Sequence, residues 1–197
     1  MKPSSIHVHG IVLAAGASSR MGSPKALLAY RGRTFLERTL DALRPACQSI
    51  AVVTARGSAE IRAICSANGV DSLINPAPER GMLSSLQCAI AARDADGYLF
   101  TPVDYPAIAP STAAAIVVAF QSAQHDSVIP VFAGRHGHPV CISRALAKRI
   151  LDLPAGASAR DAIHAADIFD LPVEDGGILL DVDTPAEYEA LTAGERS

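Results

Sequence analysis

Short apolar runs alternate along this chain with longer stretches in which apolar residues recur every three or four positions. Runs of the first kind are typical of buried strands, and stretches of the second kind are typical of amphipathic helices. Because strands that alternate with helices favour a mainly parallel sheet covered on both faces, we predict an α/β fold. The predicted strands cover residues 8–13, 49–53, 70–74, 97–101, 127–131, 140–142 and 178–182.

Local signals add detail to this pattern. Residues 34–37 (Thr-Phe-Leu-Glu) and 184–187 (Thr-Pro-Ala-Glu) both have the capping-box spacing that starts a helix. Beyond Ser127 the alternation is less regular, and we expect an insertion or an antiparallel edge strand there. The turn residues that suggest this are Gly134, Gly137, Pro139, Pro154 and Gly156.

Composition limits the class of protein. The chain has 197 residues, 49% of them hydrophobic and 19% charged, which fits one globular domain spanning 1–197. The net charge of −3 argues against nucleic acid as the main partner. We also expect no membrane span and no signal peptide. Four cysteines without a C-x-x-C pair fit a reducing compartment, so we expect a cytoplasmic protein.

The segment LAAGASSRMGSPKALL, residues 13–28, follows the first predicted strand. Ligands of open α/β sheets bind outside the carboxyl ends of the strands, where this segment would lie. It matches neither the Walker pattern nor the dinucleotide fingerprint. Its small residues would let backbone N–H groups approach an anion, and Arg20 and Lys25 would add positive charge. A glycine-rich turn with two solvated cations is the alternative that these residues leave open.

The pattern L-A-A-G-x-S-x-R-M-G-x-x-K, filled here by residues 13–25, resembles the signature of nucleotidyltransferases that activate sugars, polyols and the molybdenum cofactor. Within that superfamily the chain is most similar to the MobA-like molybdenum-cofactor cytidylyltransferases. The resemblance implies a single-domain Rossmann-like fold with a mostly parallel mixed sheet flanked by helices. It also implies a nucleotide-binding half, 1–110, and an acceptor-binding half, 111–197.

The resemblance assigns roles within this loop. Arg20 would hold the β- and γ-phosphates of a nucleoside triphosphate, and Lys25 would stabilise the charge that develops at the α-phosphate. Arg20 and Lys25 are therefore the expected catalytic residues. The rest of the loop would surround the nucleotide through Leu13, Ala14, Ala15, Gly16 and Gly22. The Leu-Ala-Ala-Gly and Ser-Pro-Lys wording looks like the branch that uses CTP rather than GTP.

Two aspartates are the expected Mg²⁺ ligands. Asp104 follows the predicted strand 97–101, where a carboxylate suits a magnesium ion held against phosphates. The family usually has glycine before this aspartate, whereas this chain has Val103. Asp183 lies in a D-x-D-T-P segment and would reach the same metal. A turn aspartate and a helix-start aspartate are the alternative readings. Asp181, on a strand, would point to the same side as Asp183.

Two further segments match the family. Ser84, in a G-M-x-x-S-like loop entering a helix, would contact the nucleotide, or it could only cap that helix. Gly137, His138 and Pro139 match a G-H-P element that would line the acceptor pocket, although a lone histidine in a turn is often structural.

The implied reaction joins CMP from CTP to the terminal phosphate of molybdopterin or the molybdenum cofactor and releases pyrophosphate. The expected partners are the triphosphate, this acceptor and, transiently, an apo-molybdoenzyme. Three alternatives stay open: a guanylyltransferase of the same cofactor, a sugar- or polyol-phosphate nucleotidyltransferase, and a delivery protein that binds the finished cofactor without catalysis.

Overall fold

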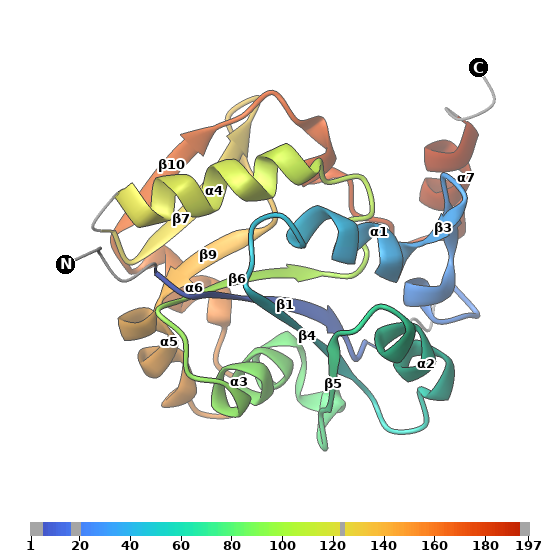
Figure 1. Cartoon of the computed structure of the whole chain (residues 1–197), viewed down its shortest axis with the longest axis horizontal. Helices are drawn as coiled ribbons and strands as arrows, with labels where there is room; N and C mark the ends of the chain where they lie inside the picture. The colour runs from blue at the N-terminus through green and yellow to red at the C-terminus, as the bar shows by residue number, and fades with distance from the viewer. Residues whose placement is uncertain (1–5, 17–20, 123–124, 194–197) are drawn as a thin grey trace.

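An eight-stranded mixed sheet forms the centre of the molecule, with helices on both faces (Figure 1). The computed structural model describes residues 6–16, 21–122 and 125–193. The strand order is β10-β7-β9-β6-β1-β4-β5, with β8 paired to β7. The strands are β1 (Val8–Ala14), β4 (Ser49–Thr54), β5 (Asp71–Ile74), β6 (Gly97–Pro102), β7 (Ser127–Phe132), β8 (Arg135–His136), β9 (Val140–Ser143) and β10 (Ile168–Pro172), and a separate hairpin pairs β2 (Ala29–Tyr30) with β3 (Arg33–Thr34).

Two hydrophobic cores fill the space between the sheet and its helices. Alternate residues of β1 divide between them: Val8 and Val12 face one core, while Ile11 and Leu13 face the other. The first core includes residues of α1, α2 and α4, and the second includes residues of α3, α5 and α6. The helices are α1 (Phe35–Leu43), α2 (Ala59–Ala67), α3 (Met82–Ala92), α4 (Pro110–Ser122), α5 (Arg144–Leu151), α6 (Ala159–His164) and α7 (Pro185–Ala193), with short 3₁₀ turns η1 (Lys25–Leu27), η2 (Pro78–Arg80) and η3 (Gly176–Leu179).

The predicted α/β fold is confirmed, and so are both capping boxes. At the start of α1 the Thr34 hydroxyl accepts from the Glu37 N–H while the Glu37 carboxylate accepts from the Thr34 N–H. Thr184 and Glu187 form the same reciprocal pair before α7. Each box satisfies backbone donors that a helix start would otherwise leave open.

One strand predicted in the last third of the chain is absent. Residues 178–182 are not a strand, because Gly176–Leu179 coil into η3. The backbone there is held by Asp175, whose carboxylate accepts from the Gly177 N–H, and a Cβ on Gly177 would lie 2.2 Å from the Ala107 carbonyl oxygen. The last strand is instead β10, whose Ile-Phe-Asp-Leu-Pro sequence is interrupted by Asp170 and has no continuous apolar run of strand length.

The expected antiparallel strand after Ser127 is present as β8, which runs antiparallel to β7 and pairs with no other strand among the described residues. β9 runs antiparallel to both neighbours, β6 and β7, and therefore lies inside the sheet rather than at its edge. The edge position belongs to β10, which is parallel to β7. The order of strands depends on long-range pairing, which a local pattern of turn residues does not encode.

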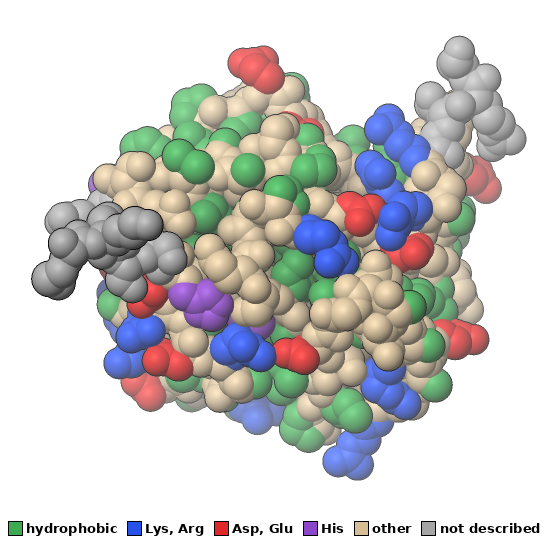
Figure 2. Space-filling view, in the orientation of Figure 1, with side chains coloured by type: hydrophobic (Ala, Val, Ile, Leu, Met, Phe, Trp, Pro, Cys, Tyr) green, Lys and Arg blue, Asp and Glu red, His purple; other side chains and the backbone are tan. Residues whose placement is uncertain are grey.

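On the face shown in Figure 2, acidic and basic side chains are interspersed rather than gathered into one broad basic surface. Among the described residues, no helix has both the length and the apolar character needed to cross a membrane.

A buried histidine at the amino end of β1 makes stability depend on pH. His9 is fully buried, its Nδ1 lies 2.8 Å from the Ser49 hydroxyl, and its Nε2 has no hydrogen-bond partner among the described residues. Burial, helped by the positive charge of Arg93, lowers the pKa of His9 to about 4. The unfolded chain therefore binds a proton at this site below about pH 6.5, whereas the folded chain does not until about pH 4.

We expect the free energy of unfolding to fall by on the order of 2 kcal/mol between pH 6.5 and 4 because of His9 alone. Urea unfolding of the wild type and of His9→Asn at pH 7 and pH 4.5 measures this. The variant should lose less stability on acidification than the wild type does. Equal losses in both proteins would contradict the assignment.

Candidate active site

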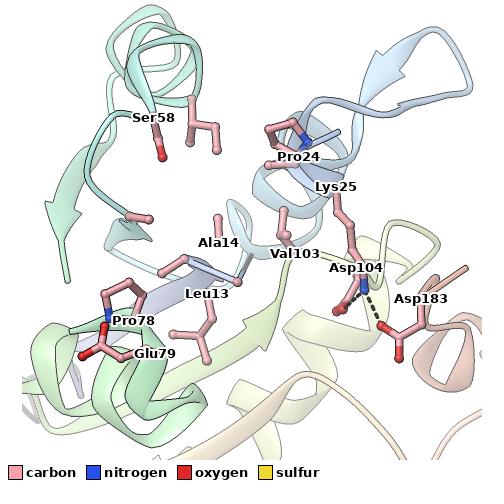
Figure 3. Close-up of a pocket in the computed structure, with 15 residues that line it drawn as sticks. Leu13, Ala14, Pro24, Lys25, Ser58, Pro78, Glu79, Val103, Asp104 and Asp183 are labelled. Carbon is pink, nitrogen blue, oxygen red and sulfur yellow. Dashed lines mark hydrogen bonds and ion pairs between the residues drawn. The ribbon is translucent and has the colours of Figure 1, made fainter. Parts of the chain in front are cut away.

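A cavity of about 530 Å³ opens at the carboxyl ends of β1, β4 and β6. The chain that follows β1 forms one wall, the segment after β4 another, and Val103 and Asp104 close it beyond β6 (Figure 3). Lining residues are Leu13, Ala14, Ala15, Gly16, Pro24, Lys25, Ala26, Ala55, Ser58, Ile61, Pro78, Glu79, Val103, Asp104 and Asp183.

Lys25 lies between two carboxylates at one end of this cavity. Its Nζ is 2.9 Å from Oδ2 of Asp104, and it also forms an ion pair and hydrogen bond with Oδ1 of Asp183 (Figure 3). The two aspartates are 79 and 158 residues away from Lys25 in the chain. The Lys25 side chain is only 12% exposed and that of Asp104 20%, against 45% for Asp183. Charge is thus concentrated at one partly desolvated point.

Backbone hydrogen bonds hold these three residues in place. The Val103 N–H donates to the Leu13 carbonyl at 3.1 Å, which keeps the end of β6 beside the end of β1. The Val182 N–H donates to the Asp104 carbonyl at 3.0 Å and so brings Asp183 alongside. Lys25 begins the η1 turn, whose Ala26 is buried in the core. The sheet and the start of α7 therefore fix the two carboxylates relative to each other.

The pKa values reflect burial opposed by pairing. Burial on its own would lower the pKa of Lys25. The hydrogen bonds to Asp183 and Asp104, with the charges of both carboxylates, more than offset burial, so the pKa lies above its ordinary value. Burial raises the pKa of Asp104, and the bond to Lys25 only partly opposes that shift. Lys25 is accordingly a cation, and Asp104 is a carboxylate that needs a nearby positive charge.

The sequence-predicted residues are brought together in part. Leu13, Ala14, Ala15, Gly16, Lys25, Asp104 and Asp183 all line the cavity. Gly22, at φ +68°, is not among the lining residues. Arg20 lies outside the described residues.

Ser84 lies outside the cavity lining. Its hydroxyl oxygen is 2.8 Å from the Asn75 amide nitrogen and about 3 Å from the carbonyl oxygens of Ala77 and Gly81. The residue is buried beneath the loop that enters α3. The structure therefore gives its side chain a role in shaping this loop, and Pro78 and Glu79 of the same loop reach the cavity instead.

A second cavity, of about 370 Å³, lies beside the same two chain segments. Tyr105 and Asp181 line it, whereas their neighbours Asp104 and Asp183 line the first cavity. The expectation that Asp181 and Asp183 point the same way is wrong, because residues 180–183 are not a strand. The other lining residues include apolar side chains such as Ile129 and Ile163, together with Arg135, His136, Arg160 and His164.

His138 forms part of this second wall. Its ring packs against Tyr105 at 4.8 Å and Phe100 at 6.0 Å between centroids. Burial lowers its pKa to about 4, and Nδ1 has no hydrogen-bond partner among the described residues. Gly137 also lines the cavity, while Pro139 is buried behind it. The histidine is therefore a neutral ring near pH 7, able to contact a ligand but not to supply charge.

Sequence reasoning missed several wall residues. No site role was predicted for Ser58, Pro78 and Glu79 in the first cavity or for Phe100, Tyr105 and Arg160 in the second. Tyr105 was recoverable, since it directly follows Asp104. The others reach their cavities only through the packing of distant elements.

Comparison with known proteins fits this geometry. The MobA-like NTP transferase domain matches residues 10–169, which is most of the chain. The chain belongs to this family. The family domain includes the loop after β1 and the end of β6, the two segments that supply Lys25 and Asp104. The protein is a nucleotidyltransferase by family and fold.

Individual relatives differ in their stated activities. The chain is 28% identical to the molybdenum cofactor cytidylyltransferase of Escherichia coli, over 94% of this chain and 95% of that one. It is 34% identical to a probable molybdenum cofactor guanylyltransferase of Rhodopirellula baltica, over 61% of this chain and 59% of that one. It is also 31% identical to the nicotine blue oxidoreductase of Paenarthrobacter nicotinovorans, over 78% and 79%.

Solved structures confirm the fold. The crystal structure of Rv0371c from Mycobacterium tuberculosis superposes with a TM-score of 0.85 at 31% identity, over 96% of this chain and 99% of that one. A manganese complex of Rv0371c gives a TM-score of 0.80 at 29% identity, over 95% and 98%. The single-domain arrangement of sheet and helices is therefore shared across the whole chain.

Gly137 offers a test of how the second cavity is built. A Cβ placed there would lie 2.4 Å from the Ile178 carbonyl oxygen, and the neighbouring His138 N–H donates to that same carbonyl. We expect Gly137→Ala to lower the free energy of unfolding by about 1–3 kcal/mol, since backbone must move to admit the methyl group. Urea unfolding measures the loss.

Gly176→Ala is the matched control, because its nearest contact would be an ordinary 3.4 Å approach to the Phe132 ring. The control should change stability by less than Gly137→Ala does. Equal stability of the two variants would show that the backbone around Gly137 moves to admit the methyl group at little cost, contrary to this expectation.

Proposed function

We propose that this protein transfers CMP from CTP to the terminal phosphate of molybdopterin or the molybdenum cofactor. The observation that carries the proposal is the Lys25 ammonium held between Asp104 and Asp183 at the mouth of the first cavity. A lysine and two carboxylates from three separate segments suit a substrate rich in both negative phosphate charge and bound metal.

The residues present fit a Mg²⁺ ion. Oδ1 of Asp104 is buried without a hydrogen-bond partner among the described residues, although burial of an unpaired carboxylate oxygen is costly. Asp104 and Asp183 would hold the ion, which would neutralise phosphate charge during transfer. That a structural neighbour was solved as a manganese complex supports a divalent ion in this family.

The chain's own residues would position and neutralise the reacting groups. Backbone N–H groups of the loop at Ala15 and Gly16 would face the triphosphate, with Arg20 and Gly22 completing the loop around it. Lys25 would contact the α-phosphate. An oxygen of the acceptor phosphate attacks the α-phosphorus, the bond from that phosphorus to the bridging oxygen breaks, and pyrophosphate leaves with the electron pair. The acceptor phosphate is already an anion and needs no general base.

The second cavity is our proposed acceptor site. Its aromatic base of Phe100, Tyr105 and His138 suits a flat heterocycle, and its arginines suit an anionic group. In two segments, residues that are close in the chain line different cavities: Asp104 and Asp183 line the first, and Tyr105 and Asp181 line the second. This supports binding of the acceptor beside the nucleotide. In this proposal, residues 1–110 form the nucleotide-binding half and residues 111–197 form the acceptor-binding half. Asp183 belongs to the second half but lines the nucleotide cavity.

Support for CTP comes from the Leu-Ala-Ala-Gly and Ser-Pro-Lys sequences of the loop. The cytidylyltransferase relative, which matches nearly the full chain, also supports it. The guanylyltransferase relative makes GTP the alternative. The relative named an oxidoreductase does not change the proposal, since this chain has no dinucleotide fingerprint and keeps the lysine and both aspartates. We further propose a cytoplasmic location and a transient contact with an apo-molybdoenzyme that receives the product.

Asp104→Asn tests the role of the carboxylate. The amide keeps the side-chain shape but removes the charge, so metal-dependent turnover of CTP and molybdopterin should fall by roughly 100-fold or more. Pyrophosphate release with Mg²⁺ measures it. Asp152→Asn, an exposed change at the end of α5, should leave the rate unchanged. Full activity in Asp104→Asn would remove Asp104 from the proposed site.

Thermal unfolding in the presence of Mg²⁺ tests the nucleotide. A ligand at about 100 times its Kd adds about 2.7 kcal/mol, and each kcal/mol moves a domain of this size by roughly 2–4 °C. We expect CTP to raise the melting temperature more than GTP, ATP or UTP does, and Asp104→Asn to lose this shift. A shift with GTP alone would assign the guanylyl reaction instead.

A further inference from the structure

The ammonium of Lys25 occupies the position between the two carboxylates that the proposed metal would need. Nζ lies 2.9 Å from Asp104 and is hydrogen-bonded to Asp183 as well, as the dashed lines in Figure 3 mark. The hydrogen bond from the Val182 N–H to the Asp104 carbonyl holds the two aspartates together. Reciprocal bonds between Thr184 and Glu187 fix the chain just beyond Asp183. The carboxylates therefore have little freedom to separate and admit a second cation.

A lysine and a divalent cation compete for these oxygens. Both are cations, and like charges a few ångströms apart repel strongly in a partly desolvated site. The side chains of Lys25 and Asp104 are only 12% and 20% exposed, so solvent screens this repulsion weakly. We therefore expect Lys25 to leave the carboxylates before a metal binds them. The Lys25 ammonium then needs another anion with which to pair.

We propose that Lys25 is an exchangeable counter-ion that closes the metal site in the nucleotide-free protein and moves to the triphosphate when nucleotide and metal bind together. This inference rests on the proposed function, in which Asp104 and Asp183 hold the metal and Lys25 contacts phosphate. The triphosphate offers Lys25 a denser negative charge than the aspartates do. The vacated carboxylates then receive the ion that the triphosphate brings.

The exchange has a thermodynamic consequence. If Lys25 opposes the metal only while nucleotide is absent, nucleotide must strengthen metal binding, and metal must strengthen nucleotide binding by the same factor. Nucleotide-free protein would hold divalent ions weakly even though it presents two carboxylates. The site would thus accept the metal–nucleotide complex in preference to either component.

The alternative to exchange is that the metal binds Asp104 beside Lys25. Oδ1 of Asp104 is buried and lacks a hydrogen-bond partner among the described residues, so in this alternative the ion binds Oδ1 while Oδ2 keeps Lys25. In that arrangement the lysine and the metal bind side by side, and removing Lys25 does not open the site.

Mn²⁺ binding separates the two arrangements. Free Mn²⁺ is measured by electron paramagnetic resonance during titration of the full chain, first without nucleotide and then with a non-hydrolysable CTP analogue. The variants are Lys25→Met and Lys25→Gln, which remove the charge but keep much of the side-chain length. Lys148→Met is the matched control, since Lys148 is exposed on α5. Circular dichroism and thermal unfolding confirm that each variant is folded.

Without nucleotide, we expect both Lys25 variants to bind Mn²⁺ roughly tenfold or more tightly than the wild type, because a competing charge is gone. Lys148→Met should match the wild type. With the analogue present, the wild type should gain affinity and the difference should shrink. Folded Lys25 variants that bind Mn²⁺ no more tightly than the wild type would overturn the exchange.

Asp104→Asn keeps this failure distinct from failure of the proposed function. If Asp104→Asn weakens Mn²⁺ binding in the presence of the analogue while the Lys25 variants show no gain, the metal site stands and only the exchange is wrong. If Asp104→Asn has no effect with the analogue either, the carboxylates do not hold the metal and both proposals fall.

Discussion

The ion pairs of Lys25 with Asp104 and Asp183 join three distant parts of the chain, and the fold is arranged to hold these parts together. One cation from the first loop meets carboxylates from the middle and the end of the chain. Buried or half-buried charges are stable only when they are paired. The fold must therefore hold the three segments together closely, and it does so with backbone hydrogen bonds that tie the end of β6 to the end of β1 and to the segment before α7.

The sheet order explains how that meeting arises. β1 lies between β4 and β6, so the loop after β1 opens next to the chain that leaves β6. Because these strands are parallel, their carboxyl ends share one edge, and the cavity forms there. The antiparallel β9 interrupts the parallel series on the far side of β6 and carries the loop with His138 to the second cavity. One reversal of strand direction thus adds a second binding wall beside the first.

Family membership gives this arrangement its chemistry, and particular residues narrow it. Relatives in the family have stated activities as different as cytidylyl transfer and oxidation, so the fold alone does not select a reaction. The lysine between two aspartates, beside a cavity lined by Phe100, Tyr105 and His138, is the feature that supports the reaction proposed here. Under the proposed exchange, the ion pairs of Lys25 would also make the metal and the nucleotide bind together.

Residue patterns were enough to predict the α/β class, the capping boxes at Thr34 and Thr184, and the loop, lysine and aspartates of the first cavity. These features are local, since periodicity, caps and short motifs are encoded by residues close together in the chain. Long-range packing instead determines that β9 is internal, that η3 replaces a predicted strand, and that Asp181 and Asp183 face different cavities. The Ser84 hydroxyl, expected to contact the nucleotide, instead accepts a hydrogen bond from the Asn75 amide. The replacement of a predicted strand by η3 shows why, because the Ala107 carbonyl that packs against Gly177 lies far away in the chain, outside any short stretch of sequence around η3.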